Sequence, residues 1–135
     1  MKLVLDTNTF TDYAEGIPQT VEFMASHGEQ LFLPSVVLGE LYYGCMKGRR
    51  QRFNEEKLHQ FISRLKVGTI EVSANVARKY ATIYVALRRK GTKIPINDVW
   101  IAACCMEVGG VLLTRDRHFE VIDQIETVVL PQVSD

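Results

Sequence analysis

The sequence has few of the residues and segments that mark secreted or membrane-spanning proteins. Its 135 residues include 3 cysteines and 4 prolines, and the formal net charge is zero. An odd number of cysteines without Cys-x-x-Cys spacing argues against a disulfide framework or a zinc site, and predicts reduced thiols in the cytoplasm. The longest uncharged apolar run, Val99–Met106, is far below the roughly 20 residues of a membrane span. The apolar stretch at the N-terminus stops at Asp6, so we expect no signal peptide and no membrane association.

The absence of net charge conceals a separation of charge along the chain. From Lys47 to Lys93, thirteen basic residues outnumber three acidic ones, so this stretch carries +10 and the remainder −10. Such asymmetry within one small domain is typical of a protein that binds a charged partner. A solvated loop and a helix end that compensates the helix dipole explain the basic clusters equally well. Candidate RNA-binding residues are Arg49, Arg50 and Arg52 in a turn, and Arg88, Arg89 and Lys90 at a helix end.

Short apolar runs alternate with helical patterns along the chain. The apolar runs predict strands at residues 3–5, 31–33, 69–72, 111–113 and 128–130. Helical spacing predicts helices at 9–15, 17–27, 35–46, from 54 onward, 73–91 and 97–108, with Ser35, Ser73 and Asn97 as caps. We therefore expect one α/β domain over residues 1–135, with a mainly parallel sheet of about five strands and helices on both faces, in three layers. Ligands of such sheets bind beyond the carboxyl ends of the strands.

Four carboxylates are candidates for a site at that edge. Asp6 and Asp116 follow the first and fourth predicted strands, where an Asp is most often a turn or cap residue. Glu40 and Asp98 lie in or at the start of apolar helices, where unpaired burial of a charge costs several kcal/mol. An ion pair would explain Glu40 without any function, and helix capping would do the same for Asp98.

These carboxylates can all meet at one edge of the sheet. Two carboxylates about 4 Å apart repel by roughly 4 kcal/mol at an effective dielectric of about 20, so the cluster would take up protons or bind a cation. Oxygen ligands without a nearby His or Cys favour Mg²⁺ or Mn²⁺ over zinc. Such ions activate water and are completed by substrate phosphates, which predicts metal-dependent hydrolysis of a phosphodiester.

The four acidic residues stand in four motifs: Asp6-Thr7-Asn8 after the first strand, Ser35–Leu41 around Glu40, Asn97-Asp98 at the start of the apolar helix, and Thr114–Phe119 around Asp116. In this order and in a chain of this length, the motifs resemble those of PIN-domain ribonucleases, specifically the VapC-like toxins of type II toxin–antitoxin systems. The resemblance covers essentially the whole chain and implies a PIN-like fold with an acidic catalytic site that holds Mg²⁺, or alternatively Mn²⁺. It implies that polar neighbours orient the carboxylates or bound water. The implied metal ligands and catalytic residues are Asp6, Glu40, Asp98 and Asp116, and the implied supporting residues are Thr7, Asn8 and Thr114.

The same resemblance implies the partners of the protein. It implies an endoribonuclease that cleaves structured RNA, often transfer RNA. It also implies a homodimer, alone or within a larger toxin–antitoxin complex, that a cognate VapB-like antitoxin neutralises. Two alternatives stay open: a catalytically silent PIN-like binding module, and a receiver domain with a phosphorylated Asp. The receiver fits less well, because no Lys follows Lys93.

Overall fold

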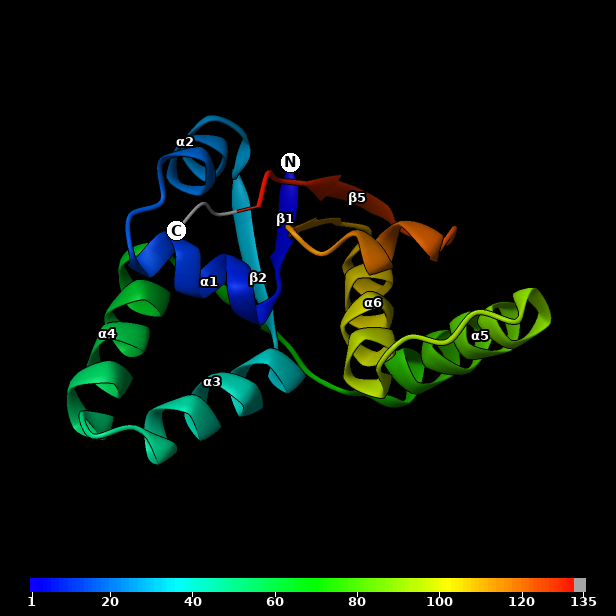
Figure 1. The fold of residues 1–135 in the computed structure, drawn as a ribbon, viewed down its shortest axis with the longest axis horizontal. Helices are drawn as coiled ribbons and strands as arrows, with labels where there is room; N and C mark the ends of the chain where they lie inside the picture. The colour runs from blue at the N-terminus through cyan, green and yellow to red at the C-terminus, as the bar shows by residue number, and fades with distance from the viewer. Residues whose placement is uncertain (133–135) are drawn as a thin grey trace.

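A parallel sheet of five strands runs through the middle of the molecule (Figure 1). The structure is a computed structural model that describes residues 1–132, so the last three residues of the expected domain lie outside the described part. In the sheet the strands follow the order β3-β2-β1-β4-β5, and every neighbouring pair is parallel. This confirms the predicted α/β class. The strands are β1 (Lys2–Leu5), β2 (Gln30–Pro34), β3 (Gly68–Ile70), β4 (Val111–Thr114) and β5 (Glu126–Val129).

The central strands are buried on both faces, which explains why they read as continuous apolar runs rather than as alternating patterns. Leu3, Val4 and Leu5 of β1 are completely buried, as are Leu112 and Leu113 of β4. The predicted strands at 3–5, 31–33 and 111–113 fall within observed strands. The two edge strands, β3 and β5, begin and end earlier than predicted. Each of them pairs with one neighbour only, so its extent depends on that neighbour rather than on its own apolar residues.

Helices cover both faces of this sheet, as expected. In Figure 1, α1 and α2 lie on one side of β1 and β2, whereas α5 and α6 lie on the other, and α3 and α4 follow the lower left margin. No helix in residues 1–132 is long and apolar enough to cross a bilayer. The helices are α1 (Thr7–Ala14), α2 (Pro18–His27), α3 (Ser35–Lys47), α4 (Gln51–Arg64), α5 (Ala74–Lys90) and α6 (Ile96–Val108), followed by the short 3-10 helix η1 (Arg117–Val121).

The predicted start of α4 at Asn54 is wrong. The Asn54 N–H already donates a hydrogen bond to the Arg50 carbonyl at 2.9 Å, so the helix begins at Gln51. Arg52 therefore lies in the helix rather than in the turn before it, whereas Arg49 and Arg50 precede it. No Gly or Pro stands between Gln51 and Asn54, so nothing in this stretch interrupts a helix. The acidic pair after Asn54 resembled a helix start but lies in the second turn.

The predicted caps of α3 and α6 are also wrong, although Ser73 caps α5 as predicted. Ser35 is the first residue of α3, and its side chain makes no capping bond. At α6 the N–H groups of Asp98 and Val99 donate to the Pro95 carbonyl at 3.0 and 3.3 Å, so the helix begins one residue before Asn97. Asp98 therefore lies inside the first turn and does not cap the helix.

An ion pair fixes the end of β4 to α1. Asp12 of α1 is buried, and its two carboxylate oxygens accept from Nε and Nη2 of Arg115 at 2.8 and 3.4 Å. The carbonyl of Arg115 in turn accepts a hydrogen bond from Gln132 Nε2 at 2.6 Å. Because Arg115 directly precedes Asp116, this pair fixes the path of the chain next to that carboxylate. The apolar pattern of the sequence contained no signal for it.

Replacing Arg115 by Met should lower the free energy of unfolding by about 2 kcal/mol. Removing one partner of a buried ion pair costs roughly 3–5 kcal/mol, and the 28% exposure of the Arg115 side chain reduces that figure. Urea denaturation of wild type and variant measures the difference. Arg117→Met is the control, because its pair with Glu120 is exposed and should contribute under about 0.5 kcal/mol. Equal losses in the two variants would contradict this assignment.

Candidate metal centre

The carboxyl ends of β1 and β4 lie at the switch point of the sheet, where the order in which strands are added changes side. The chain leaves β1 toward β2 and β3 on one side, then crosses to β4 and β5 on the other. Ligands of open parallel sheets bind at such a switch point. Asp6 directly follows β1, and Asp116 lies two residues after β4. In Figure 1 the lower end of β1, the start of α3 and the start of α6 come together at this edge.

The Asp6 carboxylate is held by hydroxyl and amide donors from two elements. It is 5% exposed, and its Oδ1 accepts from the backbone N–H of Thr9 at 2.9 Å and from the Thr9 hydroxyl at 2.7 Å. Its Oδ2 accepts from the hydroxyl of Thr114. Burial raises the pKa of Asp6, while these hydrogen bonds act in the opposite direction. Asp6 is thus a rigid carboxylate that caps α1. Sequence reasoning missed Thr9, although an Asp at the start of a helix is a recognisable N-cap, which accepts from the N–H of the second or third helical residue.

Thr114 connects Asp6 to Asp116 through one hydroxyl. Its Oγ1 donates to Asp6 and accepts from the backbone N–H of Asp116 at 2.9 Å. The Asp116 Oδ1 accepts from the backbone N–H of His118 at 2.9 Å and lies 3.0 Å from His118 Nδ1. Asp116 therefore caps η1, as Asp6 caps α1, so the capping interpretation is correct for both. Capping occupies only one oxygen of Asp116 and leaves the other for a ligand. His118 was not foreseen as part of this site.

Glu40 reaches the edge from the middle of α3. Its Oε1 accepts from the hydroxyl of Thr7 at 3.1 Å, and its side chain is half-buried. Within residues 1–132 no Lys or Arg forms an ion pair with Glu40, so the structure does not show the ion pair considered for it. Asn8 lies exposed in the first turn of α1, and in the described part its side chain makes no hydrogen bond. The structure thus brings Thr7 and Thr114 to the acidic residues and leaves Asn8 in solvent.

Asp98 differs from the other three acidic residues because, in the part of the chain described, no donor reaches its carboxylate. Its pKa is raised to about 6, first by burial and then by the negative charges of Asp116, Glu40 and Asp6. His118 acts in the opposite direction. The four acidic residues therefore share one electrostatic site, which carries an excess of negative charge that the neighbouring side chains do not neutralise.

The donor chemistry of this site fits a hard divalent cation. The carboxylates of Asp6, Glu40, Asp98 and Asp116 provide oxygens only, the ligands that Mg²⁺ and Mn²⁺ prefer. Across residues 1–132, no three side chains of His, Cys, Asp or Glu already converge to enclose an ion. Mg²⁺ commonly keeps several waters and takes one or two carboxylates, so this geometry suits an open site rather than a closed protein cage.

The two basic clusters lie on opposite sides of this centre. The turn between α3 and α4 is at the lower left of Figure 1, whereas the C-terminal end of α5 is at the far right, at the other end of the long axis. Within one chain they do not form a single basic rim. Lys90 is also engaged, because its Nζ lies 2.6 Å from Asp123 and donates to the Val121 carbonyl at 2.9 Å.

Known proteins share both this fold and this sequence pattern. The profile of the PIN domain family matches residues 3–125. The chain is 32% identical over 127 residues to the tRNA(fMet)-specific endonuclease VapC of Salmonella typhimurium, covering 93% of this chain and 95% of the relative. It is 30% identical over 120 residues to ribonuclease VapC2 of Rickettsia felis, covering 86% of this chain and 87% of the relative.

A solved structure gives the same result for the fold. The crystal structure of VapBC2 from Rickettsia felis bound to a DNA fragment from its promoter contains a chain similar to this one, with a TM-score of 0.86 and 26% identity. The match covers 96% of this chain and 98% of that chain. A parallel sheet in this order with acidic residues at its carboxyl edge thus defines a PIN-like α/β protein. The chain belongs to the PIN-domain family and, within it, to the VapC type.

Asp98→Asn should stabilise the metal-free protein at alkaline pH but not at acidic pH. The pKa of Asp98 is about 6 in the folded protein, against an ordinary value of 3.8, so above pH 6 the charged form destabilises the folded state. The penalty disappears as the folded protein takes up a proton between pH 6 and pH 4. Because the group is half-exposed, we expect a gain of about 1 kcal/mol, or roughly 3–5 °C in Tm, at pH 8.

Thermal melting in EDTA at pH 8 and pH 4 measures this difference. Glu22→Gln provides the control. Glu22 is exposed on α2, so this substitution removes the same charge at a position away from the acidic edge. A gain that is equal at both pH values, or equal in both variants, would contradict repulsion within the cluster.

Proposed function

We propose that the protein is a metal-dependent endoribonuclease that acts as the toxin of a toxin–antitoxin pair. The observation that carries this proposal is the environment of Asp98, a half-buried carboxylate whose pKa is raised by burial and by the negative charges of three other acidic residues, and which accepts no hydrogen bond in the described structure. A stable protein has no structural need for such an arrangement, and replacing the charge should stabilise the fold. Clusters of this kind, which raise the pKa of their members, are typical of functional sites.

The four carboxylates divide into an anchor and more accessible ligands. Asp6 is fixed by Thr9 and Thr114, so one of its oxygens would present a ligand at a fixed position. Glu40, Asp98 and Asp116 are partly exposed and can approach an ion together with water and substrate phosphate. A bound Mg²⁺ or Mn²⁺ supplies an activated water and stabilises the charge on the phosphate oxygens. The residues of this chain hold and orient these groups, and Thr7 restrains Glu40.

The substrate and partners are proposed from the relatives. One VapC relative is named a ribonuclease and another a tRNA(fMet)-specific endonuclease, which supports structured RNA as the substrate here. The similar chain of known structure belongs to a VapBC assembly, which supports a cognate antitoxin as partner. We further propose a homodimer, alone or within a larger toxin–antitoxin complex, acting in the cytoplasm.

Asp6→Asn and Asp98→Asn should each reduce cleavage of transfer RNA at least about a hundredfold, because each removes a ligand of the proposed ion. EDTA should stop cleavage by the wild type, and Mg²⁺ or Mn²⁺ should restore it. Gel analysis of total transfer RNA measures cleavage, and calorimetric titration with Mn²⁺ measures binding of the ion. Glu22→Gln keeps the acidic edge intact and is expected to cleave like the wild type.

The same measurements test the alternative of a catalytically silent binding module. Such a module need not bind Mn²⁺ at this edge and would leave RNA intact under all conditions. Cleavage that persists in both Asn variants, or that proceeds fully in EDTA, would refute the metal mechanism. Growth arrest on expression of the wild type, absent in the Asn variants, would connect the cleavage to toxicity.

A further inference from the structure

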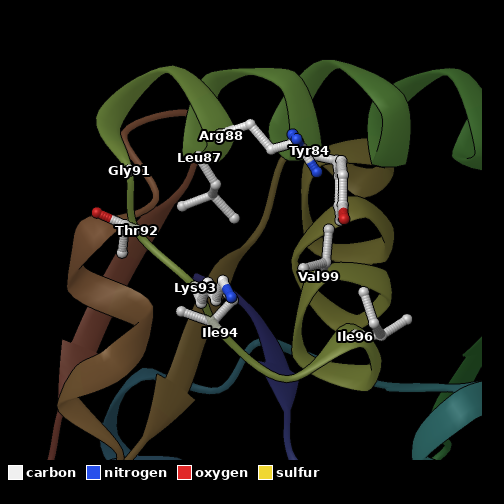
Figure 2. Close-up of a pocket in the computed structure, with 9 residues that line it drawn as sticks. All are labelled: Tyr84, Leu87, Arg88, Gly91, Thr92, Lys93, Ile94, Ile96 and Val99. Carbon is white, nitrogen blue, oxygen red and sulfur yellow. The ribbon is translucent and has the colours of Figure 1, made fainter.

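A cavity of about 420 Å³ opens beneath the C-terminal end of α5, outside the acidic centre. It lies between α5, the connection at residues 91–95 and the first turn of α6 (Figure 2). Leu87, Ile94 and Val99 give it an apolar interior, and Gly91, with a φ of +68°, lets the chain turn sharply at its edge. Its volume is at the lower end of the range for small-ligand sites, which suits a single aromatic or heterocyclic group.

The polar groups around this cavity are cationic or neutral. Among the residues that the structure describes, Arg88 and Lys93 line it and no acidic residue does, although the chain as a whole carries as many acidic as basic residues. In Figure 2 the guanidinium of Arg88 lies beside Tyr84 at the upper rim, with Lys93 across the cavity from it. Within residues 1–132 neither cation forms an ion pair, and the hydroxyls of Tyr84 and Thr92 make no hydrogen bond. These groups are therefore available to an anionic ligand with hydrogen-bonding edges.

The aromatic wall of the cavity is held in place from behind. The ring of Tyr84 stacks on Tyr80 with centroids 5.8 Å apart and an interplanar angle of 23°. Tyr80 stacks in turn on Trp100 of α6 at 4.0 Å and 17°. A preorganised aromatic wall loses little conformational entropy when a second ring packs against the site. Planar bases stack on such side chains without regard to sequence, which suits single-stranded nucleic acid.

The three basic residues at the end of α5 differ in where they point. Arg88 lines the cavity, whereas Arg89 lies with Thr82 and Val85 on another side of the helix. Lys90 is held by Asp123 and by the carbonyl of Val121. Of this cluster, therefore, only Arg88 is placed to contact a ligand in the cavity.

The first turn of α6 separates the cavity from the acidic centre. Ile96 and Val99 line the cavity, while Asp98 between them interacts electrostatically with Glu40, Asp6 and Asp116. A helix with its side chains is about 10 Å wide, a separation that an RNA strand covers in a few nucleotides. A strand whose phosphate lies at the acidic edge can therefore also reach the cavity.

We propose that this cavity, which we call the base pocket, binds one unpaired nucleotide of the RNA substrate near the cleaved bond. The base enters the apolar interior beside Tyr84, and Arg88 and Lys93 contact the adjacent phosphates. This inference rests on the proposed RNA-cleaving function and adds the requirement that the cleaved region be single-stranded or flipped out. A duplex cannot deliver an unpaired base to such a pocket.

The test is binding of a 5′-fluorescein-labelled single-stranded RNA of about twelve nucleotides, measured by fluorescence anisotropy in EDTA so that cleavage does not interfere. Arg88→Ala and Ile96→Glu should each weaken binding about tenfold. Arg89→Ala removes the same charge one residue away, and we expect a loss below about twofold. Val85→Glu is the control for Ile96→Glu, because the two side chains are similarly exposed, at 45% and 48%.

A second probe distinguishes a base pocket from a merely cationic patch. The wild type should bind the RNA about tenfold more tightly than a stable abasic oligomer of equal length and charge. Ile96→Glu should lose most of this preference, while Val85→Glu keeps it. Melting temperatures within a few degrees of the wild type would show that the exposed substitutions leave the fold intact.

The possible failures can be told apart. If the wild type binds and cleaves RNA but each variant matches its control, the base pocket is refuted and the proposed function stands. If Ile96→Glu instead converts a dimer into monomers in sedimentation without changing RNA affinity, the cavity faces a second copy of the chain, which also refutes the proposal. If the wild type neither binds nor cleaves RNA, the proposed function fails and the base pocket fails with it.

Discussion

A carboxylate buried at the end of the central strand must be satisfied, and the way Asp6 is satisfied organises the rest of the site. An unpaired buried charge is costly, so its oxygens require donors or a cation. Thr9 supplies two donors from the start of α1, and Thr114 supplies one from the end of β4. These bonds align a helix and a neighbouring strand at the same edge of the sheet. Because Thr114 also accepts from the Asp116 N–H, the position of the second acidic residue follows from that of the first.

The donors that hold Asp6 are all neutral, so they fix its position without removing its charge. Glu40 and Asp116 likewise receive mostly neutral donors, and Asp98 receives none in the described structure. The accumulated charge appears as the raised pKa of Asp98. A protein selected only for stability would replace one of these groups, since functional sites commonly retain destabilising arrangements. The Arg115–Asp12 pair, one residue from Asp116, shows that a cation is available nearby but is used to hold the chain path rather than to neutralise the centre.

The first turn of α6 lies between the acidic centre and the base pocket. Asp98 of that turn belongs to the acidic centre, whereas Ile96 and Val99 of the same turn line the base pocket, which is apolar and has cations at its rim. Separate zones of negative and positive charge are what a nuclease requires, since the ion must be held by acids while the phosphate backbone is held by bases. The zero net charge of the chain is the sum of an acidic remainder and a basic segment, residues 47–93, whose two clusters lie on opposite sides of the acidic centre.

The parallel α/β class and the positions of the four acidic residues could be predicted from local pattern. Buried strands appear as apolar runs, and each of these acidic residues either follows such a run or lies in an apolar helix. Family membership followed from the same motifs. The contacts between residues about a hundred positions apart, such as Thr114 with Asp6 and Arg115 with Asp12, depend on tertiary packing and had no signal in the local pattern. Tertiary packing also decided that the two basic clusters lie apart and that Arg88, rather than Arg89, lines a cavity. Local pattern specifies secondary structure and burial, whereas the direction and partner of a side chain depend on how distant elements pack.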